Sequence, residues 1–166
     1  MGPVQRTPLA VSGVTLIELL VTLVVLSIIL TIALPSFRDL TLNQKVKTAT
    51  YDLYTTMIYA RGEAVKDAAN VAITPETGGW KNGWKVTNSA GVTLRSQSGY
   101  SSIDIVGTAN SITYQKTGRA SLASPVSFTL NVSGNTSVTK RCVLVDPSGL
   151  PKVLMDNNQN GNCYDG

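Results

Sequence analysis

The stretch "SGVTLIELLVTLVVLSIILTIALPSF", residues 12–37, predicts how the amino-terminal third of the chain is built. Residues 19–34 are almost wholly apolar, and with residues 14–18 they reach the roughly 20 residues that a helix needs to cross a bilayer. Two residues interrupt this pattern, the acidic Glu18 near its start and Pro35 at its end. A carboxylate inside a membrane costs roughly 2.5–3.5 kcal/mol, so Glu18 calls for a polar partner, and no neighbouring side chain supplies one.

Two ordinary kinds of targeting segment fit these residues incompletely. A secretory signal peptide cleaved after Ala33 would have an apolar region of about 7–15 residues, which is shorter than the one present. A plain membrane anchor has the required length, but it gives no reason for Glu18. The basic residues also argue against export of the carboxyl-terminal part, because three of them follow the segment between positions 38 and 47, whereas only Arg6 precedes it.

After Pro35 the apolar residues recur every three or four positions. The members of this stripe are Leu42, Val46, Ala49, Leu53, Met57, Ala60 and Ala64. Such spacing predicts an amphipathic helix that lays one face on a domain and ends near residues 69–70. From residue 71 onward, short β-prone runs alternate with turn residues: VAIT, WKVT, VTLR, IDIV, SITYQ, VSFTLNV and KRCVLV. The predicted fold is therefore α+β, with one long amino-terminal helix packed on an antiparallel β-sheet.

The composition limits the classes of function open to the chain. Its 166 residues include 14 basic and 10 acidic side chains, a net charge of +4, and no histidine. This charge permits acidic partners without requiring them. Because the common nucleophile–base pairs need histidine, we predict no enzyme, and a soluble periplasmic enzyme is the rival from another class. The two cysteines, Cys142 and Cys163, favour a disulfide in an oxidising compartment over a metal site.

The amino-terminal stretch resembles the processing signal of type IV pilin-like proteins. A short leader ends in Gly13, VTLIEL follows, Glu18 is the fifth residue after the glycine, and Pro35 is the twenty-second. The resemblance implies that a prepilin peptidase cleaves after Gly13 and methylates the new amino terminus at Val14, where the family usually has phenylalanine. It also implies that Glu18 pairs with the amino terminus of a neighbouring subunit in a helical bundle and so sets the register.

Later segments resemble the FimT, FimU and GspH group of minor pilins and pseudopilins. These segments are ARGEAV at 60–65, WKNGWKV at 80–86 and ITYQKTGRA at 112–120. The resemblance implies a pilin fold in four parts. They are a prepilin leader at 1–13, a hydrophobic transmembrane and assembly half-helix at 14–35, an amphipathic half-helix at 36–69, and a β-rich periplasmic domain with a disulfide-bounded tail at 70–166.

The function that this resemblance implies is that of a minor pilin-like subunit without a cofactor. Its implied partners are other pilin or pseudopilin subunits, the prepilin peptidase and the bacterial inner membrane, with the carboxyl-terminal domain in the periplasm. Three uses of such a subunit compete, ranked from first to last. They are priming or tip assembly of a type IV pilus, DNA uptake in natural transformation, and a GspH-like pseudopilin role in type II secretion.

The sequence DNNQNGNCYDG at 156–166 contains a candidate calcium site. Asp156, Asn158 and Asn160 match the first half of a calcium-binding loop, in which alternate side chains meet on the cation. The second half, with its bidentate glutamate, is not part of the match. A polar turn held by Cys163 is the alternative interpretation.

Four basic residues are candidate DNA contacts: Arg119, Lys140, Arg141 and Lys152. The resemblance to the DNA-binding FimT branch would call for Gly-Arg-x-Arg where this chain has GLPK at 149–152. Lys152 can still meet a phosphate as a point charge, but it lacks the fork of arginine. Scattered, solvated charge is the alternative interpretation.

Overall fold

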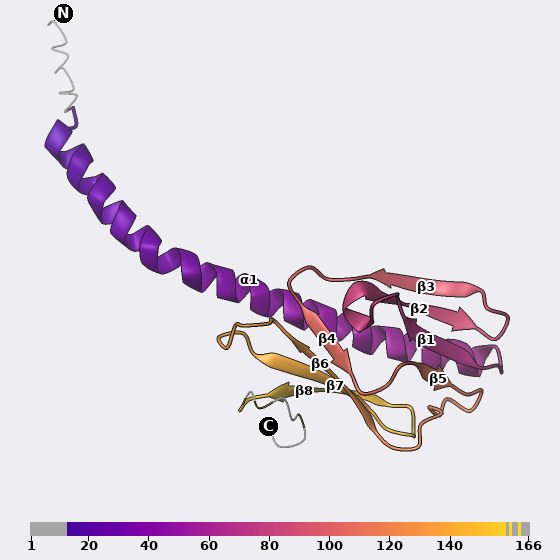
Figure 1. Cartoon of the computed structure of the whole chain (residues 1–166). Helices are drawn as coiled ribbons and strands as arrows, with labels where there is room; N and C mark the ends of the chain where they lie inside the picture. The colour runs from indigo at the N-terminus through magenta and orange to yellow at the C-terminus, as the bar shows by residue number, and fades with distance from the viewer. Residues whose placement is uncertain (1–12, 159, 161–162, 164–166) are drawn as a thin grey trace, which may run out of the picture. The chain divides into compact units, whose positions relative to one another are not determined.

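The structure is a computed structural model that describes residues 13–158, 160 and 163 (Figure 1). Two compact units meet in the sequence between Arg38 and Asp39. Apart from Gly13, the predicted leader lies outside the described residues. One α-helix, α1 (Leu16–Lys66), belongs to both units.

The first unit consists of the start of α1, and its side chains are exposed in the single chain. Every residue from Gly13 to Arg38 is exposed, including the large apolar side chains between Val14 and Phe37. By length and composition, α1 contains a segment that could cross a membrane. The apolar surface is thus the natural counterpart of lipid or of other apolar helices.

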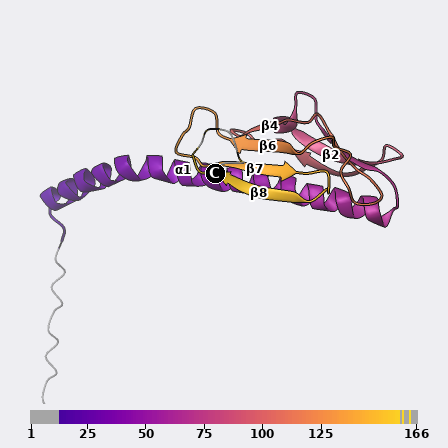
Figure 2. The ribbon, with the colours of Figure 1, turned by 90° about the horizontal axis from the view of Figure 1, so that it is seen from below.

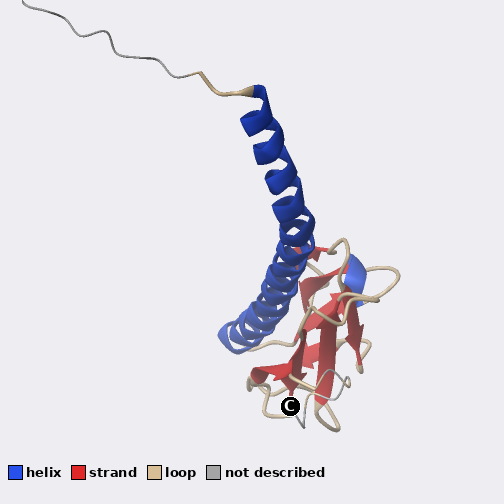
Figure 3. Cartoon of the chain, turned by 90° about the vertical axis from the view of Figure 1, so that its left-hand side faces the viewer, coloured by secondary structure: helices blue, strands red, loops and turns tan. Residues whose placement is uncertain are grey.

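The second half of α1, from Asp39, packs one face on the strands (Figure 3). All seven apolar residues of the predicted stripe are buried, together with Thr50 and Thr56. The helix ends at Lys66, a few residues earlier than predicted, because Ala68 adopts a left-handed φ of 50°. The amides of Ala68 and Ala69 then bond to the carbonyls of Val65 and Ala64, the pattern of a Schellman motif.

In the part of the chain that the structure describes, eight strands follow the helix and form two antiparallel four-stranded sheets. Their bounds are β1 (Val71–Pro75), β2 (Gly83–Asn88), β3 (Thr93–Ser98), β4 (Asp104–Gly107), β5 (Ile112–Tyr114), β6 (Val126–Asn131), β7 (Lys140–Val145) and β8 (Pro151–Asp156), with a 3-10 turn η1 (Trp80–Asn82) before β2. The first sheet has the order β3-β2-β1-β5 and the second the order β4-β6-β7-β8. The predicted fold class, a long helix on antiparallel β-structure, is confirmed.

One hydrophobic core joins the second half of α1 to both sheets. The largest fully buried side chains come from each of the three layers: Leu53 and Met57 from the helix, Trp84 and Tyr114 from the first sheet, and Phe128 from the second. Burial of this apolar surface is the main source of the domain's stability.

The structure adds two features that the sequence patterns did not predict. The strands divide between two sheets rather than one, and β8 was not recognised as a strand. Its first residue is Pro151, and its polar ends carry Lys152 and Asp156, which weakens the β signal. Proline is tolerated at the first position of a strand, and β8 is an edge strand, so neither feature prevents pairing with β7.

Candidate functional site

The predicted processing residues lie at the start of α1. Gly13 and Val14 precede the helix and are exposed. The backbone amide of Glu18 donates to the hydroxyl of Thr15 over 3.3 Å, so Thr15 and Glu18 have the spacing of a capping box. A carboxylate in the first helical turn also interacts favourably with the helix dipole. This hydrogen bond uses the backbone amide of Glu18 and not its carboxylate, so it does not supply the partner that the carboxylate requires.

The polar side chains within the apolar segment satisfy their hydrogen bonds locally. Thr22, Ser27 and Thr31 each donate to the carbonyl three residues earlier, over 2.7–2.8 Å. Such bonds lower the cost of placing a hydroxyl among lipid tails or apolar helices. Pro35 lies inside α1 and provides no amide for the carbonyl of Thr31, so the backbone ladder is weaker there. The assembly roles of Glu18 and Pro35 remain predictions.

Cys142 and Cys163 form the predicted disulfide. Their Cα atoms are 6.1 Å apart, and 21 positions separate them in the sequence. Both residues are buried in a small cluster with Leu144, whereas Val143 and Val145 belong to the main core. Because neighbouring strand residues point to opposite faces, the disulfide lies on the face of β7 away from that core. It fixes the carboxyl-terminal tail to the outer surface of the second sheet.

The three candidate calcium ligands lie at and beyond the end of β8. Asp156 is the last residue of the strand and is buried, while Asn158 and Asn160 are exposed. The side-chain oxygen of Asn158 accepts the backbone amide of Asn160 over 3.2 Å, as in a polar turn. No group of three or more acidic or thiol ligands occurs within residues 13–158, 160 and 163. Gly161, the sixth residue of the loop pattern, lies outside the described residues.

The four candidate DNA contacts fall into two places. The positive charges of Lys152 and Arg119 both lower the pKa of Asp146, so these two cations lie near the turn between β7 and β8. Lys140 and Arg141 begin β7. Lys152 lies opposite Leu144, and Leu144 is four residues, or about 14 Å, along β7 from Lys140, so the two pairs of cations are well separated.

Neither place forms a uniform basic patch. Lys140 and Arg141 are neighbours on a strand and therefore point to opposite faces. At the other place an acid stands among the cations. The hydroxyl and the amide of Ser148 bond to Asp146 and lower the pKa of its carboxyl, and the charges of Lys152 and Arg119 lower it further. The carboxylate of Asp146 therefore offsets part of the positive charge there. Binding of DNA by these residues remains a prediction.

The segments that resemble minor pilins meet one another in the structure. Arg61 donates through Nε to the carbonyl of Gly118 over 2.9 Å, which joins the ARGEAV and Gly-Arg segments. Gly149 lies against the same loop: a Cβ added to it would come within 2.3 Å of the Gly118 carbonyl oxygen, and its φ is 83°. These contacts fasten α1, the loop after β5 and the turn before β8 together.

The two tryptophans have structural roles. Trp84 is fully buried and donates through Nε1 to the Thr56 hydroxyl over 3.1 Å, and that hydroxyl donates to the Asp52 carbonyl over 2.7 Å. Trp80 donates to the carbonyl of Ala109 and packs edge-on against Phe128, with ring centroids 4.7 Å apart. Both indoles thus belong to the core rather than to a stacking surface for a ligand.

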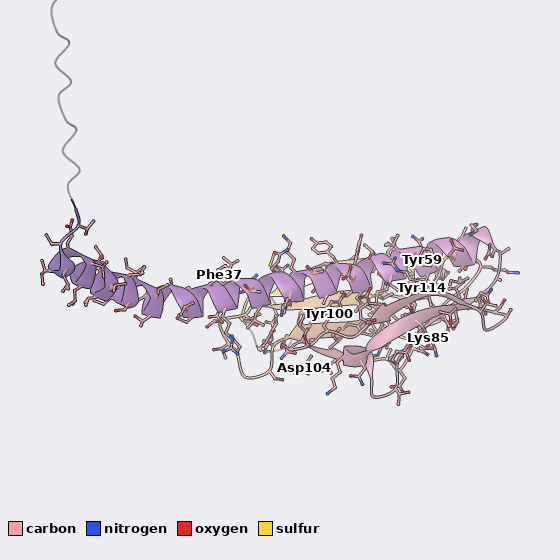
Figure 4. All side chains as sticks on the ribbon, turned by 90° about the horizontal axis from the view of Figure 1, so that it is seen from above. Phe37, Tyr59, Lys85, Tyr100, Asp104 and Tyr114 are labelled. Atoms are coloured by element: carbon pink, nitrogen blue, oxygen red, sulfur yellow. A yellow bond between two sulfur atoms is a disulfide. The ribbon has the colours of Figure 1, made fainter. Side chains whose placement is uncertain are left out.

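Two tyrosines, Tyr100 and Tyr114, have hydroxyls in buried or half-buried positions between α1 and the sheets. The hydroxyl of Tyr100 donates to the carboxylate of Asp52, and burial is the main reason that the pKa of Tyr100 is raised. Tyr114, which is also labelled in Figure 4, is fully buried, and burial raises its pKa too. Its hydroxyl has no hydrogen-bond partner among the described residues.

Comparison with known proteins agrees with this geometry. Residues 49–149 match the family described as "Type II transport protein GspH", and residues 10–34 match the "Prokaryotic N-terminal methylation motif". No curated protein that was compared with the chain matches it.

Solved structures of two minor subunits share the fold. Crystal structures of the Pseudomonas aeruginosa type IV minor pilin FimU include one with a TM-score of 0.59 and 17% identity, over 72% of this chain and 93% of that one. The minor pseudopilin EpsH from the Type 2 Secretion System of Vibrio cholerae has a TM-score of 0.54 and 9% identity, over 68% of this chain and 98% of that one. Because the GspH match spans more than half of the sequence, this chain belongs to the GspH family of type IV pilin-like minor pilins and pseudopilins.

Proposed function

We propose that this chain is a minor type IV pilin that is cleaved after Gly13, methylated at Val14 and incorporated at or near the tip of a pilus, where it primes assembly. The observation that carries the proposal is the methylation motif at residues 10–34, set directly at the start of an exposed apolar helix. The family consists of structural subunits rather than enzymes, so packing is its mechanism.

In this proposal the first half of α1 holds the subunit in the inner membrane before assembly. The β-domain lies in the periplasm, which the disulfide between Cys142 and Cys163 supports, because such bonds persist in oxidising compartments. On assembly the exposed apolar side chains of α1 would exchange lipid for the helices of neighbouring subunits. Glu18 would then lie close to the methylated amine of a neighbouring Val14, and the charge pair would favour one register.

Mass spectrometry of the membrane-extracted protein tests the processing step. We expect a chain that begins at Val14 and carries one methyl group, and a Gly13→Leu variant should retain its leader. A mature terminus at Leu34 would contradict the proposal, because it would indicate an ordinary signal peptide.

Complementation of a deletion strain tests the assembly step. Glu18→Ala should insert into the membrane at least as well as the wild type, since it removes a charge from lipid, but it should restore few pili. Ser27→Ala is the matched control within the same segment, because the Ser27 hydroxyl bonds to its own helix. Full piliation with Glu18→Ala would show that no intersubunit pair involving Glu18 is needed.

A pseudopilin role in type II secretion is the second candidate, and the match to the GspH family favours it. The two roles differ in the phenotype of a deletion. Loss of pili with normal protein secretion supports the minor pilin, whereas loss of secreted proteins with normal pili supports the pseudopilin.

A further inference from the structure

A groove of about 520 Å³ lies where the second half of α1 approaches β8. Its described lining residues come from the helix, β7, β8 and the tail: Tyr51, Arg141, Val153, Leu154, Met155, Asn157 and Cys163. Figure 2 shows β7 and β8 running alongside this part of α1. Tyr51 is 46% exposed, Leu154 is 37% exposed and Met155 is 50% exposed, so three large apolar side chains face solvent at the groove.

The groove follows the edge of β8. Successive side chains of a strand point to opposite faces, so the consecutive residues Val153, Leu154 and Met155 can share a groove only along the strand's edge. Among the described strands, β8 is last in its sheet and pairs with β7 alone. The outward row of its backbone N–H and C=O groups is therefore available to an added strand.

The charge of the groove indicates what kind of strand would fit. Arg141 is half-buried, and Lys47 is exposed one helical turn before Tyr51. No acidic residue lines the groove in the part of the chain that the structure describes. Two acids are adjacent in the sequence to lining residues. Asp156 is buried and lies opposite Lys140 in the register, and Asp52 accepts the hydroxyl of Tyr100. An arginine held beside apolar surface favours a carboxylate, which its guanidinium can bind through two hydrogen bonds.

We propose that this groove binds an extended acidic segment of a partner subunit. The segment adds a strand to β8, sets a carboxylate against Arg141 and places an apolar side chain between Tyr51 and Met155. The proposal names a kind of partner for the assembly role and so rests on that role. Peptide binding in the groove can be measured without a filament, however. A failure of the groove proposal can therefore be distinguished from a failure of the assembly role.

The test measures binding of a defined peptide to the full-length chain in detergent micelles. The probe is a fluorescein-labelled peptide of alternating valine and glutamate residues, followed by fluorescence polarisation. Two control peptides are used, one with lysine in place of glutamate and one with alternate backbone amides methylated. We expect the glutamate peptide to bind, the lysine peptide to bind at least tenfold more weakly, and the methylated peptide to lose binding because it cannot pair with β8.

Variants of the protein assign the binding to the groove. Arg141→Gln should weaken the glutamate peptide about five- to tenfold, since it removes a charge-assisted hydrogen bond. Lys152→Gln is the matched control, because it removes the same charge from the same hairpin outside the groove, and it should change binding less than twofold. If Arg141→Gln melts at a lower temperature than the wild type, the binding of the glutamate and lysine peptides to the wild-type protein still tests whether the groove prefers an acidic segment.

Three results would overturn the proposal. The first is equal binding of the glutamate peptide and its methylated counterpart, or no binding of either. The second is Arg141-dependent binding of an oligo-dT strand that displaces the peptide, which would assign the groove to nucleic acid. The third is self-association in sedimentation equilibrium that Arg141→Gln abolishes, which would assign it to a second copy. If the peptide fails to bind while Glu18→Ala still abolishes piliation, the assembly role stands and the groove does not carry it.

Discussion

The hydroxyl of Thr56 links α1 to the first sheet, and its loss should be costly. It accepts the indole N–H of Trp84 over 3.1 Å, and Trp84 is fully buried. Thr56→Val keeps the shape of the side chain but leaves this N–H without an acceptor. A buried donor left unsatisfied costs about 1–3 kcal/mol, so we expect a loss of about 2 kcal/mol in the free energy of unfolding.

A double-mutant cycle with Trp84→Phe separates the hydrogen bond from other effects. Phenylalanine has no N–H, so in that background Thr56→Val creates no unsatisfied donor. We therefore expect Thr56→Val to cost about 1–2 kcal/mol less there than in the wild type.

The measurement is urea unfolding of a fragment that begins at Asp39, the start of the compact second unit, followed by far-ultraviolet circular dichroism. For a domain of this size, a loss of 2 kcal/mol should lower Tm by about 6–10 °C. If the costs of the two substitutions add within about 0.5 kcal/mol, the bond does not contribute to stability and the reasoning is refuted.

Four further substitutions test other contacts in the same fragment. Tyr100→Phe should destabilise it because the hydroxyl bonds to Asp52, whereas Tyr114→Phe should be neutral or stabilising, because that hydroxyl has no partner among the described residues. The raised pKa values of Tyr100 and Tyr114 mean that the folded state favours the neutral phenol. The free energy of unfolding should therefore fall as pH rises past about 10, where the phenols of the unfolded chain ionise, and it should fall less steeply in either variant. Ala68→Gly should add about 1 kcal/mol by relieving the left-handed φ of 50°. Cys142→Ser should cost about 3 kcal/mol under non-reducing conditions, and equal melting would show that the disulfide contributes nothing.

Much of the fold could be predicted because its determinants are local. The helical period from Leu42 to Ala64 specified the face that packs on the strands, and all seven of its members are buried. Apart from β3, whose sequence TLRSQS is mostly polar, the strands up to β7 carry alternating or continuous apolar runs between turn residues. Their division into two sheets depends on pairings between distant segments, for example β1 with β5 and β4 with β6, and no local pattern encodes these.

The candidate binding residues could be predicted less well, because faces and edges appear only after pairing. Lys140 and Arg141 are adjacent in the sequence, yet the strand turns them to opposite faces. Arg119 and Lys152 are far apart in the sequence, yet the charges of both lower the pKa of Asp146. The groove beside Arg141 could not be predicted because it borders β8. The proline and the charged residues of β8 weaken its β-strand signal in the sequence.

Glu18 lies in the first turn of α1, where its backbone amide takes part in the helix cap, and its carboxylate has the proposed role between subunits. Within the chain its amide is capped by Thr15, and a capping box accepts either glutamate or glutamine at this position. Between subunits, the proposed pair with a neighbouring amine needs the negative charge. Both Glu18→Gln and Glu18→Ala keep the backbone amide that Thr15 caps. Glu18→Gln also keeps the size of the side chain but removes its charge, so it should restore as few pili as Glu18→Ala. Counting pili in strains that carry each variant, at equal amounts of processed protein, measures this. If glutamine restores wild-type piliation, assembly does not require the negative charge of Glu18.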